Sequence, residues 1–441
     1  MSRDQGPGGA PGSGPARGVG GRPDEATAQE PARDSLPAVD TRLLVREEGV
    51  RGYLGEFRRK LRSGELGSLP VVVAVIIIWT VFGSLNSAFL SAQNLSDLSQ
   101  QIVGTGMIAV GIVFVLLLGE IDLSVGSVSG LCAALFAVFN VINGMNEWLA
   151  LLVAVAGGAA VGLIHGFFFA KVGVPAFVVT LAGNLAWNGL MLQVLGTSGT
   201  VNIPSETNVA KLYSTIFHSP AAAYVTAAVG VGLFLAASLL DARRRQKARV
   251  PFRPVAEIVL RTVVIAAIAF AAAYILNQYQ GLPLALLIFL ILLVVLDFVL
   301  RRTTYGRRIF AVGGNIEGAR RAGISVPFVR MSVFTIAGMM AAIGGIFLAG
   351  QIQSASQTSG GGNLLMNVIA AAVIGGTSLF GGRGSVWSAL LGALVIGSIQ
   401  SGMNIMGVSN AVQFMITGSV LLAAVVVDSL SRRSQKAAGR A

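Results

Sequence analysis

The chain has 441 residues, of which 54% are hydrophobic and only 12% are charged, and its mean hydropathy is +0.74. A soluble chain of this length is far less apolar, so the composition predicts an integral membrane protein. The formal net charge of +12 does not indicate nucleic acid as a partner, because the arginines lie in loops between apolar segments, where they orient membrane proteins.

The chain begins with a polar region and then becomes apolar. Residues 1–50 are rich in Gly, Pro and Ala with mixed charge and no apolar period, which predicts a disordered cytoplasmic tail. The basic segment 51–68 predicts an interfacial stretch before the first span, and its arginines predict a cytoplasmic N-terminus. A transmembrane domain is expected over 69–430, followed by a cytoplasmic C-terminal tail at 431–441.

About 20 apolar residues cross the hydrocarbon core, and this length divides the apolar region into about twelve segments. They lie near 69–90, 99–119, 123–142, 148–170, 174–195, 221–240, 257–276, 282–300, 328–350, 364–380, 386–403 and 409–429. Hydropathy does not separate full spans from half-helices or re-entrant segments. We therefore predict an all-α, polytopic helical bundle with ten to twelve spans.

Charge in the connecting loops predicts the orientation. Loops assigned to the inside begin at Asp241 and Arg301, where several arginines occur, or contain the single Arg383. Loops assigned to the outside contain Glu147 and Glu206 but no arginine. Because basic loops stay in the cytoplasm, both termini are predicted to be cytoplasmic.

The stretch 305–327, YGRRIFAVGGNIEGARRAGISVP, predicts a short helix in one of the inside loops. Asn315 is a suitable N-cap, and Glu317 lies in the first turn, where the helix dipole favours negative charge. Arg320 and Arg321 lie in the last turn, where the dipole favours positive charge.

The end of this short helix is also marked in the sequence. Gly323 can close it in the left-handed conformation, and Pro327 is expected to prevent it from restarting. A helix of about two turns is unstable alone in water, so it needs a surface to dock against. An ordinary loop between two spans is the alternative.

A second unusual stretch is LLLGEIDLSVGSVSGL, Leu116–Leu131. A carboxylate at membrane depth costs several kcal/mol, so Glu120 and Asp122 need a compensating partner. With Ser124 and Gly126 they form a candidate gating or structural motif. Two other interpretations remain open: Asp122 or Ser124 caps a helix that begins at Val125, or Glu120 and Asp122 form a proton relay.

Two pairs of similar stretches indicate an internal duplication of the kind found in transporters. GGTSLFGGRGSVWSAL, from Gly375, resembles GEIDLSVGSVSGL, and TIAGMMAAIG, from Thr335, resembles TLAGNLAWNG, from Thr180. The order of the motifs differs between the halves.

Glycine spacing predicts close helix packing. Gly158, Gly162 and Gly166 follow one another at intervals of four residues, and Gly392, Gly397 and Gly402 form a looser series. His165, beside the first series, has no metal-ligand partner at suitable spacing, so a structural or pore-lining role is favoured and no metal is expected. The single cysteine, Cys132, excludes an intrachain disulfide.

The sequence contains no cluster typical of an enzyme. None of its lysines follows a glycine, so the loop that holds ATP phosphates is absent, and an ATP-driven process needs another chain. No cofactor is expected. Polar residues that could line a substrate path are Asn184, Trp187 and Asn188, and the pair Gln400 and Asn404. Packing between helices is the alternative role for these amides.

Four motifs together carry a family resemblance. GEIDLSVGSVSGL, FVVTLAGNLAWNGLML, YGRRIFAVGGNIEGARRAGI and AAVIGGTSLFGGRGSV resemble the membrane permease subunits of bacterial ATP-binding-cassette importers for monosaccharides. The resemblance covers about residues 70–430. The extra segments around NQYQGLP, 277–283, resemble the xylose type more than the shorter ribose type.

The resemblance implies an importer of xylose or a related pentose in the bacterial cytoplasmic membrane. Its expected partners are a second permease copy, membrane lipid, a cytoplasmic ATPase and an extracytoplasmic sugar-binding protein. It implies that 315–324 is the coupling helix, with coupling residues Gly313, Gly314, Asn315, Glu317, Ala319, Arg320, Arg321, Gly323 and Ile324. Gly318 departs from the family, where Ala is usual. The alternative function is a proton-coupled transporter that uses Glu120 and Asp122.

Overall fold

The computed structural model describes residues 69–248, 250, 252 and 254–437, with backbone only for 431–437. The chain divides into two units, 1–58 and 59–441, and every described residue belongs to the second. The predicted tail 1–50 and basic segment 51–68 therefore lie outside the described residues.

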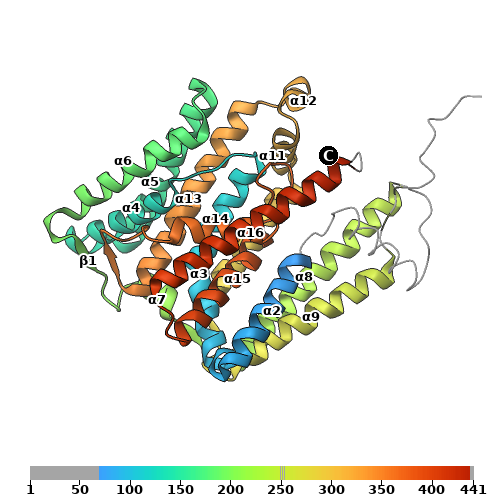
Figure 1. Ribbon diagram of the computed structural model, residues 1–441, viewed down its shortest axis with the longest axis horizontal. Helices are drawn as coiled ribbons and strands as arrows, with labels where there is room; N and C mark the ends of the chain where they lie inside the picture. The colour runs from blue at the N-terminus through green and yellow to red at the C-terminus, as the bar shows by residue number, and fades with distance from the viewer. Residues whose placement is uncertain (1–68, 249, 251, 253, 438–441) are drawn as a thin grey trace, which may run out of the picture. The chain divides into compact units, whose positions relative to one another are not determined.

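The described part of the chain is mainly helical (Figure 1). It contains 10 helices that are long and apolar enough to cross a membrane, and two shorter apolar helices, Pro70–Leu85 and Leu364–Ile374. This confirms the polytopic all-α bundle. The helices are α2 Leu69–Leu85, α3 Ala92–Leu117, α4 Val125–Ala137, α5 Glu147–Phe167, α6 Ala176–Leu195, α7 Asn208–Ser214, α8 Pro220–Lys247, α9 Val255–Asn277, α10 Leu284–Arg302, α11 Thr304–Gly314, α12 Ile316–Arg321, α13 Val326–Ile352, α14 Leu364–Ile374, α15 Trp387–Ile405 and α16 Asn410–Ala437.

Short elements complete the description. Single turns η2 to η5 cover Ser87–Leu90, Val138–Ile142, Phe168–Val172 and Gly196–Ser198. Strand β1 (Thr200–Asn202) pairs antiparallel with β4 (Ser354–Ser356), and β2 (Ile216–Phe217) pairs with β3 (Leu282–Pro283). The sequence analysis did not predict these strands, because two or three residues are too few to show a period of two.

The loops divide between two ends of the helical bundle. At one end, here called the α12 end, Arg301 donates to Ser385 at 2.8 Å and Arg302 to Asp241 at 3.4 Å. At the other, the β1 end, Glu147 accepts hydrogen bonds from the Asn208 side chain and the Val209 N–H. Loops assigned to one side of the membrane from charge alone therefore lie together.

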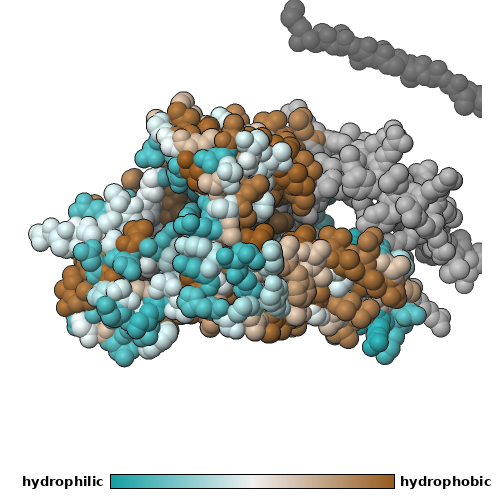
Figure 2. Space-filling view, turned by 90° about the horizontal axis from the view of Figure 1, so that it is seen from below, coloured by the Kyte–Doolittle hydropathy of each residue, from teal (hydrophilic) through white to brown (hydrophobic). Residues whose placement is uncertain are grey.

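Helices α3, α4 and α13 form the centre of the bundle. Most of α3 and α13 is buried, whereas α8, α9 and α16 bury few residues and expose apolar side chains such as Val229, Ile268 and Leu422. Figure 2 shows broad patches of hydrophobic surface beside hydrophilic ones on the face that it views. Such exposed apolar helices are suited to contact with lipid tails.

The glycine series of α5 forms the closest helix contact. Side chains at Gly158, Gly162 and Gly166 would collide with the backbone or a side chain of α13 near Gly338, Phe334 and Met331. The two helices therefore run antiparallel. This confirms the close helix contact that the spacing predicted, and the structure identifies α13 as the partner.

The looser glycine series does not form one groove. Gly392 approaches α14, Gly397 approaches Leu98 and Ile102 of α3, and Gly402 approaches Phe82 of α2. An interval of five residues turns a helix by about 140°, so each glycine faces a different neighbour.

Segments 118–124 and 375–386 interrupt the helical bundle. Helix α14 ends at Ile374 after 11 residues, too few to cross a membrane. Non-helical backbone is tolerated inside a membrane only where protein or water satisfies its polar groups. Gly382 N–H indeed donates to the O atom of Leu117, the last residue of α3, at 2.9 Å.

Candidate functional site

The two ends of α12 carry the residues that the sequence predicts there, Asn315 at the start and Gly323 after the last turn. The Asn315 side chain accepts a hydrogen bond from Gly318 N–H at 2.8 Å, which confirms the N-cap. At the other end Gly323 has φ +75°, its N–H donates to Arg320 O, and Ile324 N–H donates to Ala319 O. This pair of bonds is the Schellman arrangement, which glycine in the left-handed conformation allows.

One face of α12 is buried and the other is exposed. Ala319 is only 4% exposed, and Ile316 and Ile324 pack against the core. On the outer face Arg320 forms an ion pair with Glu317 at 2.7 Å, although both side chains are more than 60% exposed. A pair so exposed to solvent contributes little stability, so these charges remain open to a partner surface.

Three predictions about the 305–327 stretch need correction. The helix covers Ile316–Arg321 rather than 315–324, because Asn315 is its N-cap and Ala322 its C-cap, followed by the left-handed Gly323. A separate helix, α11, precedes it where the sequence analysis assigned a loop. Pro327 does not prevent a restart: it lies in the first turn of α13, a position where proline needs no N–H partner.

Helix α11 ends at a junction of three segments. A side chain at Gly313 would collide with Leu117 O and lie 2.9 Å from Gly382 N. A side chain at Gly381 would lie 2.8 Å from both Gly119 N and Gly313 O. The loops after α3 and α14 therefore meet each other and α11 backbone to backbone. Helix α11 is also tied to α13, since Tyr305 donates to Ser332 at 2.8 Å.

Glu120 and Asp122 have different surroundings. Burial raises the pKa of the Glu120 carboxyl from its usual value, and the positive charge of Arg330 partly offsets this effect. Asp122 is buried, and its Oδ1 accepts from Ser124 N–H at 2.8 Å and from the Ser124 hydroxyl at 2.6 Å. Neither Asp122 nor Ser124 caps α4, because neither side chain bonds to a free N–H of that helix. Gly126 instead lets α4 approach the backbone of Gly360.

The Asp122–Ser124 pair continues into α5 and α6. The Ser124 hydroxyl lies 3.3 Å from His165 Nδ1, and the Trp187 indole N–H donates to His165 Nε2 at 2.8 Å. The polar cluster Asp122, Ser124, His165 and Trp187 thus joins the loop after α3 to two helices. Sequence analysis selected its members separately and did not connect them. The only signal was an intramembrane histidine near a glycine ridge.

The polar cluster has one consistent set of proton positions. An indole N–H only donates, so His165 Nε2 must accept, and the proton of the neutral imidazole is therefore on Nδ1. That N–H then donates to the Ser124 oxygen, whose own proton is donated to Asp122. A hydrolytic triad is different, because its serine donates to the histidine and not to the aspartate.

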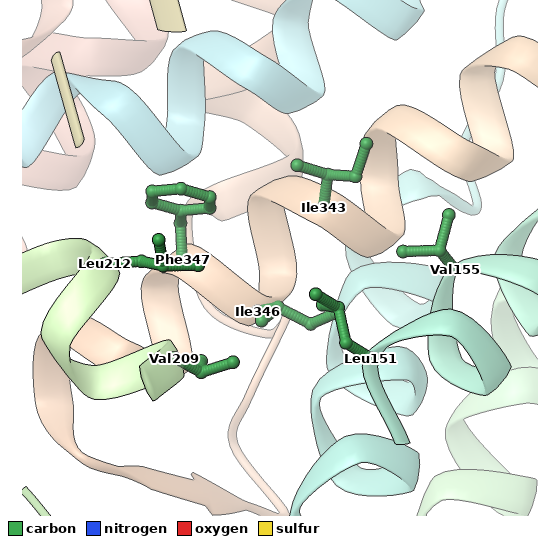
Figure 3. Close-up of a pocket in the computed structure, with 7 residues that line it drawn as sticks. All are labelled: Leu151, Val155, Val209, Leu212, Ile343, Ile346 and Phe347. Carbon is green, nitrogen blue, oxygen red and sulfur yellow. The ribbon is translucent and has the colours of Figure 1, made fainter. Parts of the chain in front are cut away.

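Further observations limit other kinds of chemistry. No group of three His, Cys, Asp or Glu residues among the described positions could hold a metal. An apolar pocket of about 230 Å³ lies between α5, α7 and α13. Figure 3 shows the side chains that line it. Its residues are Leu151, Val155, Val209, Leu212, Ile343, Ile346 and Phe347. Their apolar side chains offer no hydrogen bond to a polar solute.

The predicted path residues do not form one site within the chain. Asn184 is half-buried and Asn188 exposed on α6, which packs on α4 and α5. Gln400 and Asn404 lie on α15, which packs on α2, α3 and α14. Asn404 accepts a hydrogen bond from Gln413 of α16 at 2.9 Å, as expected for packing between helices. A role in the substrate path stays a prediction for all four amides.

Comparison with known proteins places this arrangement in a family. The family model described as branched-chain amino acid transport system permease component matches residues 94–425. The chain is 37% identical to the xylose transport system permease protein of Escherichia coli K12 over 376 residues, which cover 85% of this chain and 94% of that protein. No solved structure gives a significant match.

Two further relatives have related names. The xylose transport system permease protein of Haemophilus influenzae is 34% identical, with 85% of this chain and 99% of that protein covered. The ribose import permease protein of Bacillus subtilis is 30% identical, with coverage of 83% and 94%. The chain is therefore a multi-pass membrane transport subunit, not an enzyme, and it belongs to the family of transport-system permease components that includes these sugar permeases.

Proposed function

We propose that this chain is the permease subunit of an ATP-driven monosaccharide importer, with xylose or a related pentose as substrate. Two copies form the translocation path in the bacterial cytoplasmic membrane. A separate ATPase binds the α12 end from the cytoplasm, and a sugar-binding protein docks at the β1 end outside. Both termini are then cytoplasmic.

The observation that carries the proposal is the structure of α12. It is a capped helix whose buried face packs on the bundle and whose charged face, with Glu317, Arg320 and Arg321, is exposed. It provides the rigid docking surface that a motor protein needs. The xylose and ribose permeases among the relatives support the sugar as substrate.

The junction at Gly313 supports a route for coupling. ATP-driven movement of α12 would move α11, and α11 touches the loops after α3 and α14 backbone to backbone. Both loops interrupt the bundle, so their displacement can open or close a path between the helices. This is alternating access driven from the α12 end.

Helix α6 supports a position for the path. Asn188 is exposed and Asn184 is half-buried near the middle of this helix, where an amide facing lipid would be costly. A path between two copies would provide water and sugar hydroxyls as hydrogen-bond partners for them. Trp187 lies between these amides in sequence and would add an aromatic surface.

The test is sugar uptake by proteoliposomes that contain the permease, its ATPase and its binding protein. We expect labelled xylose to accumulate only when ATP reaches the ATPase, and to be insensitive to a protonophore. Uptake that persists without ATP and stops with the protonophore would contradict this proposal and favour the proton-coupled alternative, with Glu120 and Asp122 as relay.

A further inference from the structure

The polar cluster has a feature that a simple packing contact does not require. With the proton positions assigned above, its side-chain hydrogen bonds all run in the same direction, from Trp187 through His165 and Ser124 to Asp122. His165 and Asp122 are each 2% exposed, and Ser124 is fully buried, whereas Trp187 is only partly buried. The cluster therefore has a buried inner end and a partly accessible aromatic end.

The inner end determines which group His165 presents to Trp187. Ser124 donates its only proton to Asp122, so its oxygen can accept from His165 Nδ1–H. This leaves Nε2 as an acceptor, as the indole N–H requires. Asp122 and Ser124 thus select the histidine tautomer that holds Trp187.

The space around the contact is restricted. A side chain at Gly183 would collide with His165 Nε2 and lie 3.0 Å from Trp187 Nε1. The imidazole and indole rings have centroids 5.9 Å apart at 50°. The indole can therefore keep this hydrogen bond only in a narrow range of orientations. Its partly exposed surface lies on the helix that carries Asn184 and Asn188.

We propose that His165, with its tautomer set by Ser124 and Asp122, is a positioning residue that orients Trp187 as an aromatic platform for the sugar ring beside Asn184 and Asn188. The inference rests on the proposed function. A pyranose has an apolar C–H face and a rim of hydroxyls, so it suits one aromatic surface flanked by amides.

Two substitutions at position 165 separate positioning from packing. His165→Gln places an amide oxygen near Nε2, so it can still accept from Trp187. The shorter side chain of His165→Asn reaches only the position of Nδ1. It can keep the hydrogen bond to Ser124 but cannot accept one from Trp187. We expect the KM of ATP-driven xylose uptake to rise about tenfold in His165→Asn with similar ATPase activity, and to change little in His165→Gln.

Ser124→Ala should also raise the KM of xylose uptake, because His165 loses the hydrogen-bond acceptor that fixes its tautomer. The matched control is Ser129→Ala on α4: Ser129 is also buried, but it donates to Gly126 O of its own helix. We expect this control to behave as the wild type. Equal effects of His165→Asn and His165→Gln, or of Ser124→Ala and Ser129→Ala, would overturn the inference.

A spectroscopic measurement tests the contact without transport. In the full chain with Trp79, Trp148 and Trp387 replaced by Phe, the wavelength of maximum Trp187 fluorescence should shift in His165→Asn and stay unchanged in His165→Gln.

A double substitution tests the same contact through transport. In a Trp187→Phe background, His165→Asn should cause no further change in the KM of uptake; additive effects would overturn the inference. Failure of wild-type ATP-driven uptake would instead contradict the proposed function, while the emission result would still test the contact.

Discussion

At the scale of single residues, the carboxyl groups of Glu120 and Asp122 have different surroundings, although only one residue separates them. Asp122 is buried and bonded to Ser124, while Glu120 is partly buried near Arg330 of α13. Burial penalises the charged form of a carboxyl group, and a nearby cation compensates for only part of this penalty. The two carboxylates are therefore unlike each other, although they are two residues apart.

The raised pKa of Glu120 predicts a pH dependence of stability. The folded state binds this proton more tightly than the unfolded state, so the contribution is complete below the ordinary pKa of 4.5 and is lost as the pH rises through the raised value. Glu120→Gln replaces the carboxyl group that titrates with a neutral amide. The melting temperature of the wild type relative to this variant should fall as the pH rises between about 4 and 8. A difference independent of pH would contradict the assignment.

The sequence predicted these residues to different extents. Asn315 and Gly323 could be identified because a cap depends on backbone groups three or four residues away. The contact between His165 and Trp187 joins residues 22 apart, and that between Ser124 and His165 joins residues 41 apart. Such contacts depend on which helices pack together, and residue spacing along the chain does not determine this.

At the scale of elements, the junction between α11 and the two loops is the contact that links α12 to the centre of the bundle. Gly313 faces Leu117 and Gly382, whereas its neighbour Gly314 has open space where a side chain would be. Two adjacent glycines in the last turn of one helix therefore have different roles, and they provide a matched pair of substitutions.

We predict that Gly313→Ala lowers ATP-driven uptake at least about tenfold, because its methyl group would force α11 away from Leu117 by overpacking. Gly314→Ala should lower uptake far less, since nothing in the described chain lies within 4 Å of the added atom. ATPase activity and uptake are measured in the same proteoliposomes. Equal uptake by the two variants would contradict the coupling role of the junction.

Helix boundaries were predictable where the chain has clear capping or helix-breaking residues, and not elsewhere. The long spans and the ends of α12 were clear from apolar length, caps and Gly323. Helix α11 was missed because its sequence, TYGRRIFAVGG, has three glycines and two adjacent arginines and resembles a loop. The early end of α14 was missed because the non-helical residues after it are also small or apolar.

At the scale of the whole described bundle, close packing against α13 positions α5, the helix that carries His165. His165 lies on α5 between Gly162 and Gly166, and both glycines face α13. The backbone contact therefore fixes the position of α5, and with it that of His165, along α13. The sequence predicted the groove from spacing, but it did not identify α13 as the partner.

Gly162→Ala should destabilise the protein by about 1–3 kcal/mol through overpacking, because its methyl group would meet Phe334 O. Gly157→Ala on the same helix is the control, since its methyl group would meet only the flexible Leu135 side chain at 3.3 Å. Thermal unfolding in detergent measures both variants. A melting temperature lowered equally by the two would show that α5 is sensitive to any added side chain, contrary to this account.

The central claim is that a separate ATPase drives this permease through the charged face of α12. Its most direct test is the number of sugars imported per ATP hydrolysed by the reconstituted complex, for wild type, Glu317→Arg, Arg320→Glu and the double exchange. The double exchange restores the ion pair within α12 but reverses the charges that a partner meets. We predict that both single variants and the double exchange insert in the membrane, yet hydrolyse ATP without importing sugar. Normal import per ATP in the single variants, or its full recovery in the double exchange, would contradict the claim.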